Sequence, residues 1–125
     1  MNTASGAFGE QYTAAYLQKH GFTVLERDFS VRGGELDIIA RNAQYLIFVE
    51  VKTRSQGALT APAEAVTAAK RRRIARAALC YLQAHPSDLQ PRFDVACVEI
   101  TQEKPMRVTS FSYFANAFFP EVGFF

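Results

Sequence analysis

Four ionisable residues on two neighbouring segments have the types and spacing to do chemistry. The segments, 34–40 and 45–54, are rich in β-branched and large apolar residues and flank a short polar break at 41–44. This pattern predicts a β-hairpin. Because side chains alternate between the two faces of a strand, one face collects these four: Glu35, Asp37, Glu50 and Lys52. The opposite face keeps these apolar residues: Leu36, Ile38, Ile47, Val49 and Val51.

The register of the hairpin decides how close the carboxylates lie. A loop of even length centred between Asn42 and Ala43 would place Asp37 opposite Phe48. Asp37 and Glu50 are then diagonal neighbours with Cα atoms roughly 7–8 Å apart, close enough to reach one small cation. Crowded carboxylates are costly to remove from water unless a cation compensates. Mg²⁺ prefers oxygen ligands and fills its other positions with water and phosphate oxygens, so the array suits metal-assisted hydrolysis of a phosphodiester.

An ordinary half-exposed hairpin is the alternative interpretation. Its polar face would be solvated, and Glu50 and Lys52 would form a surface ion pair of little energetic value. An isolated Glu-x-Lys triplet fits that description well, because short motifs match by chance. The full combination is more selective, since it also requires Asp37 in the preceding strand, a short turn and one consistent face.

The segments GELDIIA and LIFVEVKTR resemble the core of the PD-(D/E)xK nuclease superfamily, and specifically the YraN-like family of small bacterial predicted endonucleases. The likeness extends to FGEQYTAAYLQKHGF, KRRRIARAALCYL and RFDV. It implies an α/β fold with a restriction-endonuclease-like αβββαβ core, a mixed sheet flanked by helices. It also implies that Asp37 and Glu50 hold Mg²⁺ or Mn²⁺ and that Lys52 is the catalytic lysine. The backbone carbonyl of Val51 would complete the protein ligands, and Leu36 stands where the superfamily's name has proline.

A first helix is expected from about Ser5, as N-cap, to His20. Glu10 falls on its apolar stripe and is predicted to point toward the protein. It is either an additional acidic group beside the metal, as the resemblance implies, or a glutamate favoured by the helix dipole. Glu35 is the other candidate for a second metal or an outer-shell position.

A longer helix, expected from about Thr60 to Ala84, carries a basic run without an acidic residue. The run consists of Lys70, Arg71, Arg72, Arg73 and Arg76. Lys70 shares an apolar stripe with Ile74 and is predicted to face inward, while the arginines spread around the exposed side. We expect this surface to contact nucleic-acid phosphates in a sequence-independent, salt-sensitive way. A solvated helix face is the alternative.

Three further strands are expected, at Phe22–Ser30, Gln90–Thr101 and Arg107–Phe111. The first is partly polar at 26–28, as an edge strand would be, and we assign those residues no catalytic role. The tail from about 111 is aromatic. Helical spacing relates these residues: Phe111, Phe114 and Phe118. The final Phe124 and Phe125 could be exposed and so invite a partner or a homodimer, with disorder or back-packing as alternatives.

The length and composition fit one globular domain, 1–125, with 49% hydrophobic and 21% charged residues. No apolar stretch is long enough to span a membrane and no targeting sequence is evident, so we expect a cytoplasmic protein. Cys80 and Cys97 are predicted to be reduced. The hairpin residues and the family resemblance together imply a metal-dependent DNA endonuclease. Branched DNA is one substrate to consider, because the family is distantly similar to archaeal Holliday-junction resolvases. The alternative is a catalytically inactive nucleic-acid-binding or scaffolding module.

Overall fold

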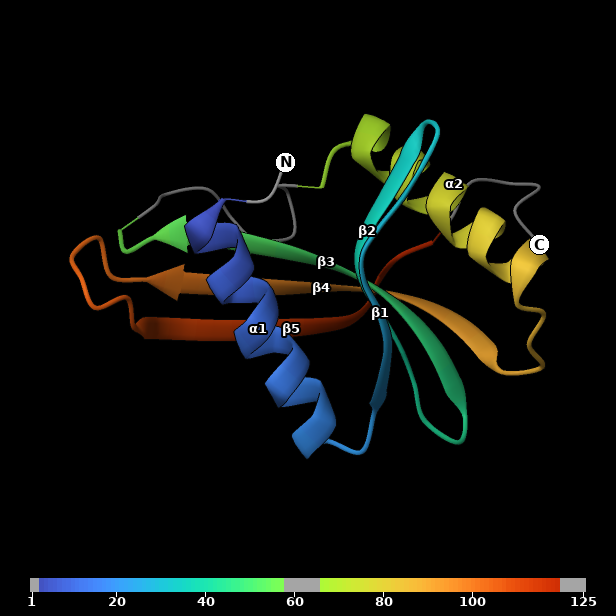
Figure 1. Ribbon diagram of the computed structural model, residues 1–125, viewed down its shortest axis with the longest axis horizontal. Helices are drawn as coiled ribbons and strands as arrows, with labels where there is room; N and C mark the ends of the chain where they lie inside the picture. Colours follow the sequence, from blue (N-terminus) through green and yellow to red (C-terminus); the bar gives the residue numbers. More distant parts are fainter. Residues whose placement is uncertain (1–2, 58–65, 120–125) are drawn as a thin grey trace.

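The structure, a computed structural model, describes residues 3–57 and 66–119 (Figure 1). Its elements in chain order are α1 (Ala4–Lys19), β1 (Thr23–Val31), β2 (Gly34–Arg41), β3 (Tyr45–Ser55), α2 (Ala68–Ala84), β4 (Gln90–Ile100) and β5 (Val108–Phe118). The first six follow the predicted αβββαβ order, and β5 adds a further strand.

The strands form one mixed sheet in the order β1-β2-β3-β4-β5. Strands β3 and β4 are parallel, and the other neighbouring pairs are antiparallel. A parallel pair needs a long crossover connection, and here that connection contains α2. The predicted restriction-endonuclease-like core is therefore confirmed.

The two helices cover opposite faces of the sheet, and each closes an apolar cluster. On one face, α2 residues pack with sheet residues in this cluster: Ile74, Ala77, Ala78, Tyr81, Leu36, Ile39, Phe48 and Phe93. On the other face, α1 residues pack in this one: Ala14, Leu17, Ile38, Ile47 and Val49. Neither helix, over the residues that the structure describes, is long and apolar enough to cross a membrane.

The β2–β3 hairpin forms as predicted, but its register differs by two residues. The Asn42 side chain accepts hydrogen bonds from the backbone N–H groups of Gln44 and Tyr45, at 2.9 and 2.7 Å. These bonds move the centre of the turn one residue along the chain, so Ile38 pairs with Val49. A shift of two residues keeps the alternation of faces, which is why the predicted grouping survives for most side chains.

Strand β2 changes direction just before the pair of Ile38 with Val49. As a result, the face predicted for Leu36 is wrong. Leu36 packs in the α2 cluster with Ile39, whereas Ile38 packs in the α1 cluster. The regular pairing of β2 with β3 ends at Ile38, so strict alternation no longer holds beyond it. With the new register, Asp37 comes level with Glu50 and not with Phe48.

Both helices begin at residues other than those expected, because threonines cap them. Thr3, not Ser5, is the N-cap of α1, and its side chain accepts a hydrogen bond from the N–H of Gly6. Thr67 caps α2 in the same way through the N–H of Lys70. The helix expected from Thr60 therefore begins at Ala68, and residues 58–65 lie outside the described chain.

The described part of the C-terminal aromatic segment is a strand as far as Phe118, so the helical spacing predicted for Phe111, Phe114 and Phe118 is wrong. Strand β5 runs to Phe118 and pairs with β4, as its aromatic and β-branched composition favours. Phe111 and Tyr113, two residues apart, both lie against Tyr16 of α1. Pro120, Phe124 and Phe125 lie outside the described residues. The two cysteines, Cys80 and Cys97, are free as predicted.

Candidate metal centre

The candidate metal centre lies where β2 separates from β3. Figure 1 shows β1 and β2 bending away from β3 near the middle of the sheet. At this point the N–H of Val51 donates to Oδ2 of Asp37 at 2.7 Å, so a carboxylate takes the place of a strand carbonyl. The separation lets side chains from β2, β3 and α1 approach one another.

Glu50 is the buried acidic group on the β3 side of this opening. It is 3% exposed, and its Oε2 lies 3.9 Å from Nζ of Lys52 and 3.7 Å from Nζ of Lys70. Its carboxyl group is also within side-chain hydrogen-bonding range of Asp37. The structure therefore brings together the three residues predicted from the hairpin, and it adds a second lysine.

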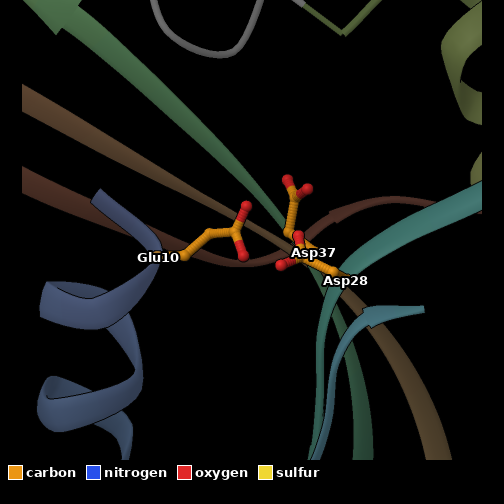
Figure 2. Close-up of side chains that lie close together, drawn as sticks. All are labelled: Glu10, Asp28 and Asp37. Atoms are coloured by element: carbon orange, nitrogen blue, oxygen red, sulfur yellow. The ribbon is translucent and has the colours of Figure 1, made fainter. Parts of the chain in front are cut away.

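A second set of carboxylates meets Asp37 from the other side. One carboxylate oxygen from each of Glu10, Asp28 and Asp37 lies within 4.8 Å of the other two. Figure 2 shows Glu10 reaching from α1 toward the two aspartates on the β1–β2 hairpin. Glu10 is buried, Asp37 is half-buried and Asp28 is exposed, so the cluster opens to solvent on the Asp28 side.

Two glycines allow the helices to approach the sheet closely enough to build this arrangement. A Cβ at Gly9 would collide with Oγ1 of Thr53 on β3, so the first turns of α1 can lie against the strand only without a side chain there. A Cβ at Gly34 would lie 2.7 Å from the backbone oxygen of Arg73 and 2.8 Å from the backbone nitrogen of Ala77. Gly9 thus places Glu10, and Gly34 admits the helix that carries Lys70.

Two of the buried carboxylate oxygens have no hydrogen-bond partner within the described part of the chain. They are Oε1 of Glu10 and Oε1 of Glu50. Buried polar atoms are nearly always satisfied, and leaving one unpaired is costly. A hard divalent cation such as Mg²⁺ or Mn²⁺ takes carboxylate oxygens as ligands. The residues present therefore fit such an ion.

The electrostatics of these carboxylates are those expected of a site built for a cation. Burial, then the charge of Asp37 and a side-chain hydrogen bond with it, raises the pKa of Glu50 to about 8. Burial, then a hydrogen bond with Asp28 and the charge of Asp37, raises the pKa of Glu10 to about 8. Burial also raises the pKa of Asp37 itself. Each group holds its proton more strongly than in water, and a cation would replace these protons.

Glu35, the other additional acidic candidate, has cations for neighbours. Its Oε1 accepts a hydrogen bond from Nζ of Lys70 at 2.8 Å and lies 3.6 Å from Nε of Arg73. The hydrogen bond from Lys70 is the main reason that the pKa of Glu35 is lowered. A direct role of Glu35 in holding a metal stays a prediction.

The basic run on α2 divides as the sequence predicted. Lys70 is half-buried and points into the carboxylate cluster, whereas the four arginines are exposed. Some of them also have partners in the fold: the guanidinium of Arg71 lies over the ring of Phe118, and Nε of Arg76 donates to the backbone oxygen of Arg32. The four exposed arginines of α2 are called the arginine surface: Arg71, Arg72, Arg73 and Arg76.

Asp28, which received no role from the sequence, lies beside Asp37 and Glu10. The β1–β2 pairs Phe29 with Leu36 and Arg27 with Ile38 place it level with Asp37. This register follows from a turn at Arg32 and Gly33, whereas a turn centred on 33–34 would have placed Asp37 opposite Ser30. Asp28 also has a positive φ of 51°, a conformation that aspartate tolerates better than most residues, and this turns its carboxylate out of regular alternation.

The fold and the cluster together define a protein of the restriction-endonuclease-like class. Within that class, residues 9–98 match the sequence model of the family described as Uncharacterised protein family UPF0102. A UPF0102 protein of Geobacter metallireducens is 42% identical over 105 residues, which cover 83% of this chain and 86% of the relative. One from Syntrophotalea carbinolica is 51% identical over 94 residues, covering 74% and 76%. The chain belongs to UPF0102, the YraN-like family whose resemblance the sequence motifs carried.

Proposed function

We propose that this protein is a metal-dependent endonuclease of the cytoplasm that hydrolyses phosphodiester bonds in DNA, with branched or structured DNA among its substrates. One observation carries the proposal. Carboxylates from α1, β1 and β2 meet at Asp37, and Glu50 of β3 also contacts Asp37. Two buried oxygens among these groups, Oε1 of Glu10 and Oε1 of Glu50, have no donor within the described residues. A purely structural cluster would have no reason to leave them so.

Asp37 and Glu50 would hold Mg²⁺ or Mn²⁺ together with the backbone carbonyl of Val51, and Glu10 and Asp28 extend the same set of oxygen ligands. When bound, such an ion lowers the pKa of coordinated water and offsets the charge that develops on the phosphate. The N–H of Val51 fixes the orientation of the Asp37 carboxylate through its 2.7 Å hydrogen bond. This bond keeps Oδ2 of Asp37 engaged.

Lys52 would be the residue that acts on substrate. Its ammonium lies 3.9 Å from Glu50, and its side chain is 32% exposed, so it can reach a phosphate at the surface while staying close to the ligands. A cation at this place would stabilise the negative charge of the pentacovalent state or orient the attacking water. The four exposed arginines of α2 would hold the neighbouring backbone phosphates.

The competing proposal is a nucleic-acid-binding or scaffolding module without turnover. The exposed arginine surface of α2 supports it, because phosphate binding needs no catalytic group. A binding module does not explain the unpartnered oxygens of Glu10 and Glu50, and we therefore place it second.

Cleavage of labelled single-stranded, duplex, flap and four-way DNA in the presence of Mn²⁺ tests the proposal. We expect cleavage of at least one substrate by the wild type, with a loss of roughly 100-fold or more in Asp37→Ala and in Lys52→Ala. Asp88→Ala, which removes an exposed aspartate from the loop before β4, is the matched control and should retain activity.

Unchanged activity in both Asp37→Ala and Lys52→Ala would end the catalytic assignment. Salt-sensitive binding with no metal-stimulated cleavage of any substrate would favour the binding module instead.

A further inference from the structure

Lys70 occupies a position that the proposed chemistry does not use. Its ammonium lies between two carboxylates of different kinds, 2.8 Å from Oε1 of Glu35 and 3.7 Å from Oε2 of Glu50. Glu35 has a side chain that is 42% exposed, whereas that of Glu50 is 4% exposed. Lys70 donates its hydrogen bond to the more exposed Glu35, whereas it interacts with the buried Glu50 through charge alone.

We propose that Lys70 is an internal counter-ion of the carboxylate cluster that competes with the divalent metal, and that Glu35 is the anchor that limits this competition. The inference rests on the proposed metal site. It makes Lys70 and Glu35 positioning residues, which act on the metal through Glu50, and it places Lys70 in the site and not on the arginine surface.

The competition follows from the distances. An ammonium 3.7 Å from Glu50 stabilises that carboxylate in the absence of metal, because opposite charges at this separation attract strongly where solvent is largely excluded. The same ammonium repels a divalent cation that approaches the same carboxylate. Removing the ammonium should therefore strengthen metal binding.

Glu35 should have the opposite effect on metal affinity. It holds the ammonium by the only short hydrogen bond among the contacts described for Lys70, and Arg73 lies 3.6 Å from the same oxygen. Without Glu35, the nearest carboxylate left to Lys70 is Glu50, and the ammonium would move onto the metal ligand. Loss of Glu35 should therefore weaken metal binding, but only while Lys70 is present.

Calorimetric titration of the metal-free protein with Mn²⁺ at low ionic strength tests this pair of effects. We expect Lys70→Met to lower the dissociation constant for Mn²⁺ about tenfold or more, and Glu35→Gln to raise it about tenfold. In a Lys70→Met background the effect of Glu35→Gln should shrink to less than about threefold, as a double-mutant cycle reveals. Lys19→Met removes an exposed lysine from the end of α1 and controls for net charge. Lys70→Gln replaces Lys70→Met if the latter does not fold.

Each outcome bears on a different claim. Equal Mn²⁺ affinity in the wild type and Lys70→Met would overturn the role of Lys70 and leave the metal site standing. An equal weakening by Glu35→Gln in both backgrounds would identify Glu35 as a metal ligand and overturn its role as an anchor. If neither the wild type nor Lys70→Met binds Mn²⁺, the metal site itself is overturned, and with it both proposals.

Discussion

Replacing Glu50 by glutamine should make the metal-free protein more stable at high pH while changing little at low pH. Burial first, and then Asp37, raises the pKa of Glu50 from 4.5 to about 8. Below pH 4.5 the group is protonated in both states. Between pH 4.5 and 8 the unfolded chain releases this proton while the folded chain keeps it, so the free energy of unfolding falls by about 1.4 kcal/mol per pH unit. Stability is lost as the pH rises.

The magnitude follows from the same values. A pKa that moves from 4.5 to about 8 corresponds to about 5 kcal/mol above pH 8. The Glu50→Gln variant recovers only part of this free energy, because the ion pairs of Glu50 with Lys52 and Lys70 are lost with the charge. We therefore expect Glu50→Gln to be about 2–3 kcal/mol more stable than the wild type at pH 8.5, and within about 1 kcal/mol of it at pH 5.

Urea unfolding in EDTA at pH 5, 7 and 8.5 measures this difference directly. Glu103→Gln, which changes an exposed glutamate in the loop between β4 and β5, is the matched control and should show no such trend. Added Mn²⁺ should stabilise the wild type at pH 8.5 more than the variant, because the ion binds the ionised carboxylates. If the wild type and Glu50→Gln differed in free energy of unfolding by the same amount at pH 5 and at pH 8.5, the charge of the buried Glu50 would not destabilise the metal-free protein.

Two further predictions concern the elements around the site. Gly9→Ala should lower the free energy of unfolding, measured with urea, by about 1–3 kcal/mol through the collision with Thr53. Adding Thr53→Ala should recover part of this loss. If the losses of the two single variants simply add in the double variant, the proposed contact is contradicted. Arg72→Ala combined with Arg73→Ala should weaken DNA binding and reduce the slope of log K against log salt by up to about 2, as measured by fluorescence anisotropy. The charge-matched control carries alanine at Lys104 and Arg107. An unchanged slope would show that the arginine surface does not bind DNA.

Most of the secondary structure and the grouping of the central residues were predictable because both depend on local pattern. Period-two alternation predicted that Asp37, Glu50 and Lys52 lie together, and the structure does bring them together. Alternation tolerates a register error of two residues, so the wrong turn centre did not disturb this result. The apolar stripe of α2 likewise predicted that Lys70 faces inward.

The features that were wrong or missed depend on departures from regular geometry. Leu36 was assigned to the wrong face because β2 leaves the ladder before Ile38. Asp28 received no role because its segment has the polar composition of an edge strand, and only the pairing of β1 with β2 brings it level with Asp37. The pairing of Lys70 with Glu35 spans 35 positions in the chain, and no local pattern predicts which of several acidic residues a buried lysine will meet.

We propose above all that Asp37 of β2 and Glu50 of β3 hold one hard cation. Crystals soaked in Mn²⁺ and measured at the manganese absorption edge test it most directly. We predict an anomalous peak about 2.1 Å from carboxylate oxygens of Asp37 and Glu50, which disappears in Asp37→Ala. A peak elsewhere, or no peak between these two side chains at saturating Mn²⁺, would contradict the account.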